Sequence, residues 1–495
     1  MKTRQLTGYT CCRTIIIILF LVSGLRTSAQ VAPQLAHFLQ SPALRGASVA
    51  FMAKEVKSGQ VLCCYEAERE LTPASVMKTV TTASALEILG EDFRFETSIQ
   101  YDGQIRDSVL NGNLYIYGGG DPTLNSSVMK MAKDGVIAVW ASAVKKAGIR
   151  QITGSIIADE SIFDTEGVSM KWLMEDLGAD YGQGSYGLNI FDNHFALFLK
   201  TDFAGSQPGI LYTEPPMPSL VFHNYLKTVS VTEDSYYITG FPYSNERYLY
   251  GALPSNRPLL KISGDIPEPA LYLAGYFHKY LSNQGVKIKN DPSCYRILAQ
   301  AGQWKESERT KLVTTHSPAL KEIVHTTNFV SHNLFADALV KTLGLRCPAT
   351  PEDAVSSFDK GARVIRDYWN EKGINASSLW MFDGSGLALT DKVTVEFLCN
   401  LYVYMATQSK VSDAFIESLP QAGMDGTLAG TLRGTPLQGK ARLKSGSMSR
   451  VRCYGGYVTK SDKQYAVAII INNYSGKSSY IRPAIEELFL ALFKD

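Results

Sequence analysis

Ser75 and Lys78 are the two side chains in this sequence whose types and spacing are best suited to chemistry. A serine and a lysine three residues apart lie on one face of a helix, so the hydroxyl and the amine can meet. Burial or a neighbouring cation lowers the pKa of a lysine, and the neutral amine can then accept the serine proton and activate the hydroxyl as a nucleophile. The same spacing recurs at Ser127/Lys130, Ser142/Lys145 and Ser357/Lys360. The spacing therefore predicts a catalytic pair only where its context supports one.

Ser331-His332-Asn333 and Lys444-Ser445-Gly446 are two later segments with candidate side chains. A hydroxyl and a carboxamide two residues apart can shuttle a proton and hold a substrate amide, although a lone Ser-x-Asn is also typical of a turn or helix cap. The third segment offers a fixed cation, a hydroxyl and a glycine that lets a substrate approach the backbone. Lys57-Ser58-Gly59 has the same letters, but a hairpin turn explains it.

The order of these three segments matches the N-to-C order of the penicillin-recognising serine enzymes. Four flanking segments extend the match: Pro73-Ala74-Ser75, Gly118-Gly119-Gly120-Asp121-Pro122-Thr123-Leu124, Asp383-Gly384-Ser385-Gly386-Leu387 and Gly423-Met424-Asp425-Gly426-Thr427-Leu428. With them the chain resembles the class C low-molecular-mass penicillin-binding proteins, which are D-alanyl-D-alanine carboxypeptidase/endopeptidases. It departs from that family at Ser445, where threonine is usual, and at His332, where Asp is common and where we expect an altered cleft rim.

The resemblance implies a serine-type D-Ala-D-Ala carboxypeptidase that acts on peptidoglycan stem peptides. Ser75 would attack the carbonyl of the penultimate D-alanine, Lys78 would accept its proton, and Ser331 would help to pass a proton to the leaving D-alanine. Water would then release the acyl-enzyme, so no cofactor is implied, and β-lactams would be covalent inhibitors. Whether the enzyme trims terminal D-alanine, cuts cross-links or does both stays open.

Substrate-binding roles are also implied by the resemblance. Asn333 would orient the substrate amide, Lys444 and Ser445 would bind the terminal carboxylate beside Gly446, and the charge of Lys444 would help to keep Lys78 neutral. The backbone N–H groups of Ser75 and Ser447 would form the oxyanion hole. Asp159 resembles a family acidic residue that reaches the cleft, although a turn-capping Asp after a strand explains it almost as well.

Strand and helix patterns near both ends of the chain predict the elements that position these residues. Early strands are expected at 48–56 and 61–65, and late strands at 441–444, 453–459 and 465–471, before a helix at 480–493. A helix capped by Thr72, with Pro73 in its first position, would carry Ser75 and end at Gly90. These elements predict an α/β fold of the α+β type, with one antiparallel sheet assembled from both ends of the chain and flanked by helices.

The middle of the chain changes character. Short β-rich runs with Gly, Pro and Asp turns fill 95–300, and helical periodicity returns at 318–345 and 354–371. We therefore expect a catalytic, serine β-lactamase/DD-peptidase-like domain formed by 30–94 and 301–495. The region 95–300 would be inserted into it as two smaller β-rich domains.

The N-terminus and the composition bound the remaining function classes. Residues 1–29 read as a signal peptide, with basic residues, a short apolar run and small residues before Gln30. We expect an exported protein, periplasmic or extracellular, soluble after cleavage and without a stable membrane span. The formal charge of +2 indicates no nucleic acid partner, and the seven histidines show no ligand spacing, so we predict no metal.

Four alternative readings are weaker. A β-lactamase would need a base that hydrolyses the penicilloyl ester quickly, and no glutamate lies in a convincing motif for that role. A protein that only binds wall peptide would not need all three motifs. The Gly-x-x-x-x-Gly-Lys match at 434–440 contains Pro436 and is followed by Ala441 instead of a hydroxyl residue, and no Gly-x-Ser-x-Gly esterase elbow occurs.

Overall fold

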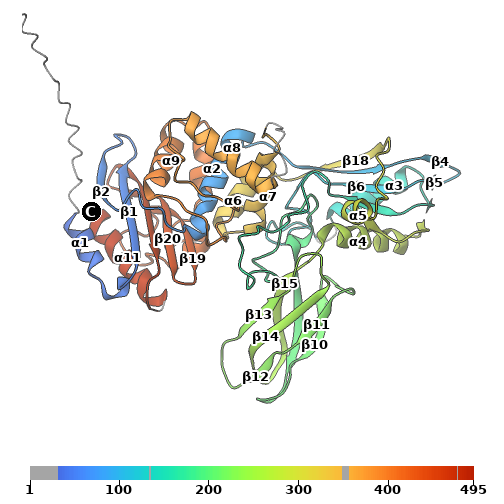
Figure 1. Cartoon of the computed structure of the whole chain (residues 1–495), viewed down its shortest axis with the longest axis horizontal. Coiled ribbons are helices and arrows are strands. Elements are labelled where there is room, and N and C mark those ends of the chain that lie inside the picture. Colours follow the sequence, from blue (N-terminus) through green and yellow to red (C-terminus); the bar gives the residue numbers. More distant parts are fainter. Residues whose placement is uncertain (1–31, 133–134, 348–355, 477, 495) are drawn as a thin grey trace, which may run out of the picture.

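The computed structural model describes residues 32–132, 135–347, 356–476 and 478–494. The expected signal peptide at 1–29 lies outside these residues. Figure 1 shows three bodies: a helix-rich body that joins the two ends of the chain, in blue and orange-red, an arm built from the middle of the chain, and a small β-sheet body that projects from it. Among the residues that the structure describes, none of the helices is long and apolar enough to cross a membrane.

A five-stranded antiparallel sheet forms the centre of the first body. Its strands, in sheet order, are β19 (Ala441–Met448), β20 (Val451–Lys460), β21 (Lys463–Asn472), β1 (Ser48–Glu55) and β2 (Val61–Tyr65). Two strands come from the start of the chain and three from its end, which confirms the sheet predicted from the sequence. Because β19 is an edge strand, half of its backbone N–H and C=O groups face away from β20.

Helices cover both faces of this sheet, and the alternation along β1 explains why. Ala50 and Met52 point to one face and pack against the helices there, whereas Val49 and Phe51 point to the other. The first face carries α2 (Met77–Leu89), α6 (Leu320–Phe329), α7 (Asn333–Gly344), α8 (Ser357–Glu371), α9 (Val395–Thr407) and α10 (Ser412–Ser418). The second face carries α1 (Pro33–Leu39) and α11 (Ser478–Phe493). The sheet is therefore buried between two helical layers.

The turn that carries Ser75 differs from the predicted helix start. Residues Ala74–Val76 form a 3₁₀ turn (η2), and α2 begins only at Met77 and ends at Gly90, whose φ is 85°. Thr72 is not the cap, because its hydroxyl donates to the carbonyl of Leu389 and accepts from Lys392. Ala74 has a φ of 45°, a left-handed conformation that non-glycine residues seldom adopt. Tertiary contacts, not a local cap, thus place Ser75.

The predicted helical stretch at 318–345 is broken at a functional position. Helix α6 ends at Phe329 and α7 begins at Asn333, and Ser331 lies between them with a φ of 65°. Left-handed conformations of this kind cost about 1–3 kcal/mol and cluster at functional sites. This break makes Ser331 part of a sharp turn and places Asn333 in the first turn of α7.

Residues 96–316, which we call the inserted region, contain a five-stranded sheet and a four-stranded sheet whose strands come from both ends of this stretch. The strands are β3 (Glu96–Tyr101), β4 (Gln104–Arg106), β5 (Val109–Asn111), β6 (Leu114–Tyr117), β7 (Gln151–Ile152), β8 (Ile156–Asp159), β16 (Lys287–Ile288), β17 (Ser293–Cys294) and β18 (Thr310–His316). The helices are α3 (Gly135–Lys146), α4 (Pro269–Asn283) and α5 (Tyr295–Gln300). Strand β18 lies beyond residue 300, where we expected the chain to return to the catalytic domain, yet it pairs with β3. We propose that this boundary lies near residue 317.

The small projecting body is made by residues 194–265. Its strands are β9 (His194–Thr201), β10 (Gly209–Glu214), β11 (Val221–Asn224), β12 (Lys227–Val229), β13 (Ser235–Thr239), β14 (Glu246–Pro254) and β15 (Arg257–Asp265). They form two sheets around a separate apolar core that includes Phe195, Leu249 and Ile262. We propose that these residues are the second inserted domain.

Candidate active site

Lys78 lies at the centre of the candidate site. Its Nζ is 3.0 Å from Ser75 Oγ, 2.6 Å from Asn333 Oδ1 and 2.8 Å from the backbone oxygen of Ser385. The side chain is fully buried. The structure thus brings together the first and second predicted motifs, 255 residues apart in the sequence.

The pKa of Lys78 is set by opposing effects. Burial lowers it to about 8, and the carboxyl groups of Asp337, Asp383 and Asp391 act against burial and raise it. Burial and the charge of Asp383 hold the pKa values of Asp337 and Asp391 well above their usual range. With its pKa lowered to about 8, Lys78 is partly neutral near neutral pH, as a general base requires.

Lys444 joins the third motif to the second. Its Nζ is 3.0 Å from Ser331 Oγ and 2.7 Å from the backbone oxygen of Ser445. Burial, and then repulsion from the charge of Lys78, lowers the pKa of Lys444 well below its usual range. We expected the charge of Lys444 to keep Lys78 neutral, but burial is the main cause of the lowered pKa of both lysines. A bound carboxylate would restore the charge of Lys444.

Ser445, Gly446 and Ser447 lie on the edge strand β19. The Oγ of Ser445 is 3.1 Å from Oγ1 of Thr427, which places the Gly423–Leu428 motif beside the third motif. Ser447 is exposed on the same strand.

Gly446 has a packing role that the sequence did not reveal. A Cβ at this position would lie 2.7 Å from the backbone oxygen of Pro73 and 3.1 Å from the backbone nitrogen of Ser75. The glycine therefore allows β19 to approach the turn that carries Ser75.

We predict that Gly446→Ala lowers the free energy of unfolding by about 1–3 kcal/mol, because the new methyl group meets backbone atoms that cannot rotate away. The rate of acylation of Ser75 should fall as well. Thermal denaturation and labelling by a fluorescent penicillin measure the two effects. Gly209→Ala is the matched control, since no heavy atom outside its chain neighbours lies within 4 Å of a Cβ there. Equal behaviour of the two variants would contradict the packing role.

His332 does not lie at the rim of the cleft, where we expected it. Its side chain is only 9% exposed, and Nε2 lies 3.8 Å from Oδ1 of Asp192 in the inserted region. The ring packs on Phe335 at a centroid distance of 4.2 Å, and burial lowers the pKa of His332 to about 4. The residue between Ser331 and Asn333 therefore contributes to the contact between the catalytic body and the inserted region.

Asp159 does not join the other predicted residues. Its Oδ2 accepts a hydrogen bond from Arg309 at 2.6 Å, and its Oδ1 accepts one from the backbone nitrogen of Ser161 at 3.2 Å. The side chains of Asp159 and Arg309 are 3% and 9% exposed, so this is a buried ion pair within the inserted region. The alternative explanation, a turn-capping Asp after a strand, fits these contacts better than a cleft residue does.

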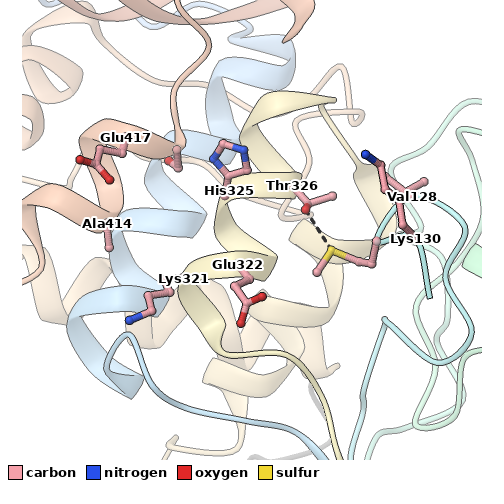
Figure 2. A pocket seen from close by; sticks show the side chains of 10 residues that line it. Val128, Lys130, Lys321, Glu322, His325, Thr326, Ala414 and Glu417 are labelled. Carbon is pink, nitrogen blue, oxygen red and sulfur yellow. Dashed lines mark hydrogen bonds between the residues drawn. The ribbon is translucent and has the colours of Figure 1, made fainter. Parts of the chain in front are cut away.

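The other Ser-x-x-Lys pairs lie in different surroundings. Ser127 and Ser357 donate hydrogen bonds to the carboxylates of Asp192 and Asp164, and Ser142 is exposed. Lys130 lines a separate pocket of about 420 Å³ (Figure 2), with residues of α6 and α10. The lining of that pocket does not include Ser75, Lys78 or Lys444. Only the Ser75/Lys78 pair therefore combines burial with the contacts of a base.

Three groups at the site were not predicted as site groups. The backbone oxygens of Ser385 and Tyr181 accept hydrogen bonds from Lys78 and Asn333. Every residue type has a backbone carbonyl, so the sequence does not indicate which ones lie at the site. Asp337 follows Asn333 by four residues, so its helical spacing from the second motif was the available signal.

Comparisons with known proteins agree with this geometry. The chain is 27% identical over 456 residues to a D-alanyl-D-alanine carboxypeptidase of Actinomadura sp. (strain R39), covering 88% of this chain and 80% of the relative. It is 25% identical over 439 residues to the D-alanyl-D-alanine carboxypeptidase DacB of Haemophilus influenzae, covering 87% and 86%.

The fold is also shared with a solved structure. Penicillin binding protein 4 from Haemophilus influenzae superposes with a TM-score of 0.78 at 23% identity, over 93% of this chain and 99% of that chain, which confirms the predicted fold class. The sequence model of the D-Ala-D-Ala carboxypeptidase 3 (S13) family matches residues 31–489. This chain therefore belongs to the D-Ala-D-Ala carboxypeptidase 3 (S13) family, which confirms the family and the enzyme class predicted from its motifs.

Proposed function

We propose that this enzyme removes the terminal D-alanine of peptidoglycan stem peptides through an acyl-enzyme on Ser75. The observation that carries the proposal is the contact of Lys78 Nζ with Ser75 Oγ at 3.0 Å in a buried site. Ser75 Oγ forms a bond to the carbonyl carbon of the penultimate D-alanine as Lys78 takes its proton. The C–N bond then breaks, and D-alanine leaves with a proton.

The proton that Lys78 took from Ser75 must reach the leaving nitrogen, and the contacts of Ser331 support a path through its hydroxyl. Its hydroxyl lies 3.0 Å from Lys444 Nζ, and it is separated by one residue from Asn333, which contacts Lys78. Ser331 passes the proton to the leaving nitrogen, and Asn333 holds the substrate amide. The N–H groups of Ser75 and Ser447 stabilise the oxyanion, and loss of one such donor typically costs about 10²–10³ in rate. Water then cleaves the ester, and no cofactor takes part.

Lys444 and Ser445 bind the carboxylate of the terminal D-alanine in this proposal. We predict that Lys444→Ala lowers kcat/KM for a D-Ala-D-Ala peptide by about 10–100-fold, because a hydrogen bond to a charged group contributes about 1.5–3 kcal/mol. For the same peptide with a C-terminal carboxamide, kcat/KM should fall much less, since that peptide has no carboxylate for Lys444 to bind. Lys463→Ala, at an exposed lysine paired with Glu55, is the matched control. An equal loss for both peptides would place the carboxylate elsewhere.

The partners and the location of the enzyme follow from the substrate. β-Lactams resemble the D-Ala-D-Ala end and acylate the same serine, so we propose them as covalent inhibitors. Stem peptides lie outside the cytoplasm, which agrees with the signal peptide predicted at 1–29. We therefore propose an exported enzyme, periplasmic or extracellular, that is soluble after cleavage.

The proposal is tested by incubating the purified enzyme with peptidoglycan fragments and analysing the products by mass. Release of one D-alanine from pentapeptides supports the carboxypeptidase, and conversion of cross-linked dimers to monomers adds endopeptidase activity. Rapid turnover of penicillin, with neither product, would identify a β-lactamase instead. Substrate binding without products would identify a binding protein.

A further inference from the structure

Besides Ser75, Lys78 has two hydrogen-bond acceptors, and the 172–181 segment of the inserted region contacts one of them directly and reaches the other through Asp383. Those acceptors are Oδ1 of Asn333 and the backbone oxygen of Ser385. The segment's two ends, Trp172 and Tyr181, each reach one of them, directly or through one residue.

Tyr181 fixes the orientation of the Asn333 amide. Its backbone oxygen accepts a hydrogen bond from Nδ2 of Asn333 at 2.8 Å. A carbonyl oxygen can only accept, so the NH₂ group must face Tyr181 and the amide oxygen must face Lys78. A rotated amide would present N–H groups to the amine instead.

Trp172 acts on the second acceptor through Asp383. Its Nε1 donates to Oδ2 of Asp383 at 2.7 Å, and its side chain is buried. The same carboxylate accepts hydrogen bonds from the backbone nitrogens of Ser385 at 3.0 Å and of Gly386 at 2.6 Å. Asp383 therefore shapes the turn at Ser385 and Gly386, and the carbonyl of Ser385 faces Lys78. The indole N–H of Trp172 contacts Asp383 from the inserted region.

The middle of the segment is fixed to the small projecting body. The backbone oxygen of Leu177 accepts from Gly240, that of Gly178 accepts from Asp265, and Ala179 pairs with Gly264. Lys341, a buried lysine on α7, donates to the carbonyls of Glu166 and Ser185 on either side of the segment. The segment is therefore held from both bodies.

These contacts have a stereochemical consequence for the base. A neutral amine has two N–H groups and one lone pair. The carbonyl of Ser385 and the amide oxygen of Asn333 can only accept, so each takes one N–H of neutral Lys78. The lone pair is then left to point at the hydroxyl of Ser75, 3.0 Å away.

We propose that the 172–181 segment holds the two acceptors of Lys78 and so directs its lone pair at Ser75, with Trp172 as a positioning residue. This inference rests on the proposed role of Lys78 as the base. It gives the inserted region a part in catalysis through the position of the base, on which Trp172 acts through Asp383.

The test is the kinetics of acylation of the full chain by a fluorescent penicillin, with Trp172→Phe as the variant. The expected result is a fall of about 10-fold in the acylation rate constant, because small misplacements of a catalytic group cost up to about 10². The dissociation constant of the non-covalent complex with the penicillin should change less than about twofold. A loosened fold would instead weaken this binding as well as slow acylation. Trp304→Phe is the matched control, since its Nε1 donates to Glu306 at 2.9 Å within the inserted region.

An unchanged rate constant in folded Trp172→Phe, or an equal fall in the control, would overturn the proposal. Should Trp172→Phe not fold, Asp383→Asn decides: four N–H groups donate to the Asp383 carboxylate, and an amide in its place has only one accepting oxygen, so the acylation rate constant should fall by about 10-fold. An unchanged rate constant in folded Asp383→Asn would overturn the proposal. Absence of labelling in the wild-type enzyme would instead refute the proposed function.

Discussion

Ser75→Ala should abolish both release of D-alanine and covalent labelling by a fluorescent penicillin, while the protein stays folded. The hydroxyl of Ser75 is the only protein oxygen in the proposal that bonds to the substrate carbon, so no neighbouring group can replace it. Removal of such a nucleophile reduces turnover by more than about 10³-fold. Alanine fits at this position, because it deletes one partly exposed atom and leaves the 3₁₀ turn intact.

The readouts for this variant are D-alanine release, gel fluorescence after penicillin treatment and thermal denaturation. Ser142→Ala is the matched control, because Ser142 has a lysine at the same spacing but is exposed on α3. It should label like the wild type. Undiminished labelling of Ser75→Ala, or loss of labelling in Ser142→Ala, would show that the nucleophile lies elsewhere.

The second large effect is expected for Lys78→Arg. An arginine keeps a positive charge and donors for Asn333 and Ser385, but it cannot lose its proton at any pH at which the protein is folded. If Lys78 is the base, acylation should fall by about 10²–10⁴-fold. If Lys78 only supplied charge, the arginine would preserve much of the rate.

The pH profile of the wild type provides an independent check on this role. Since burial lowers the pKa of Lys78 to about 8, the acylation rate should rise with pH through that value as the amine loses its proton. The residual rate of Lys78→Arg should lack this rise. A wild-type rate that is flat between pH 6 and pH 9, or one that falls over this range, would contradict general base catalysis by Lys78.

Several features of the fold could be predicted because they have local causes. The central parts of β1 and β21 are continuous apolar runs buried on both faces, and an apolar run of strand length is readable in a sequence. Gly90 ends α2 with a positive φ, as a helix-ending glycine does. The start of that helix was predicted wrongly, because the turn at Ala74 is held by the 383–388 segment: a Cβ on Gly386 would lie 1.9 Å from the backbone oxygen of Ala74.

Some of the predicted site residues could likewise be found from local patterns, and others could not. The candidates were proposed because their motifs occur in a fixed order. The structure places Lys78 in contact with Ser75 and Asn333, and Lys444 in contact with Ser331. Asp159 and His332 were interpreted from resemblance alone. Each has a buried contact with a distant residue, Arg309 or Asp192, that no local pattern could reveal.

The sequence by itself determined the family and singled out the proposed nucleophile and the lysine beside it, because these depend on residue types at fixed spacings. Only the tertiary structure decided how that lysine is held. Burial sets its pKa, and backbone oxygens of Ser385 and Tyr181 set its surroundings, from segments about 100 to 310 residues away. Every residue carries a backbone oxygen, so its presence at a site depends on folding and leaves no mark in the sequence.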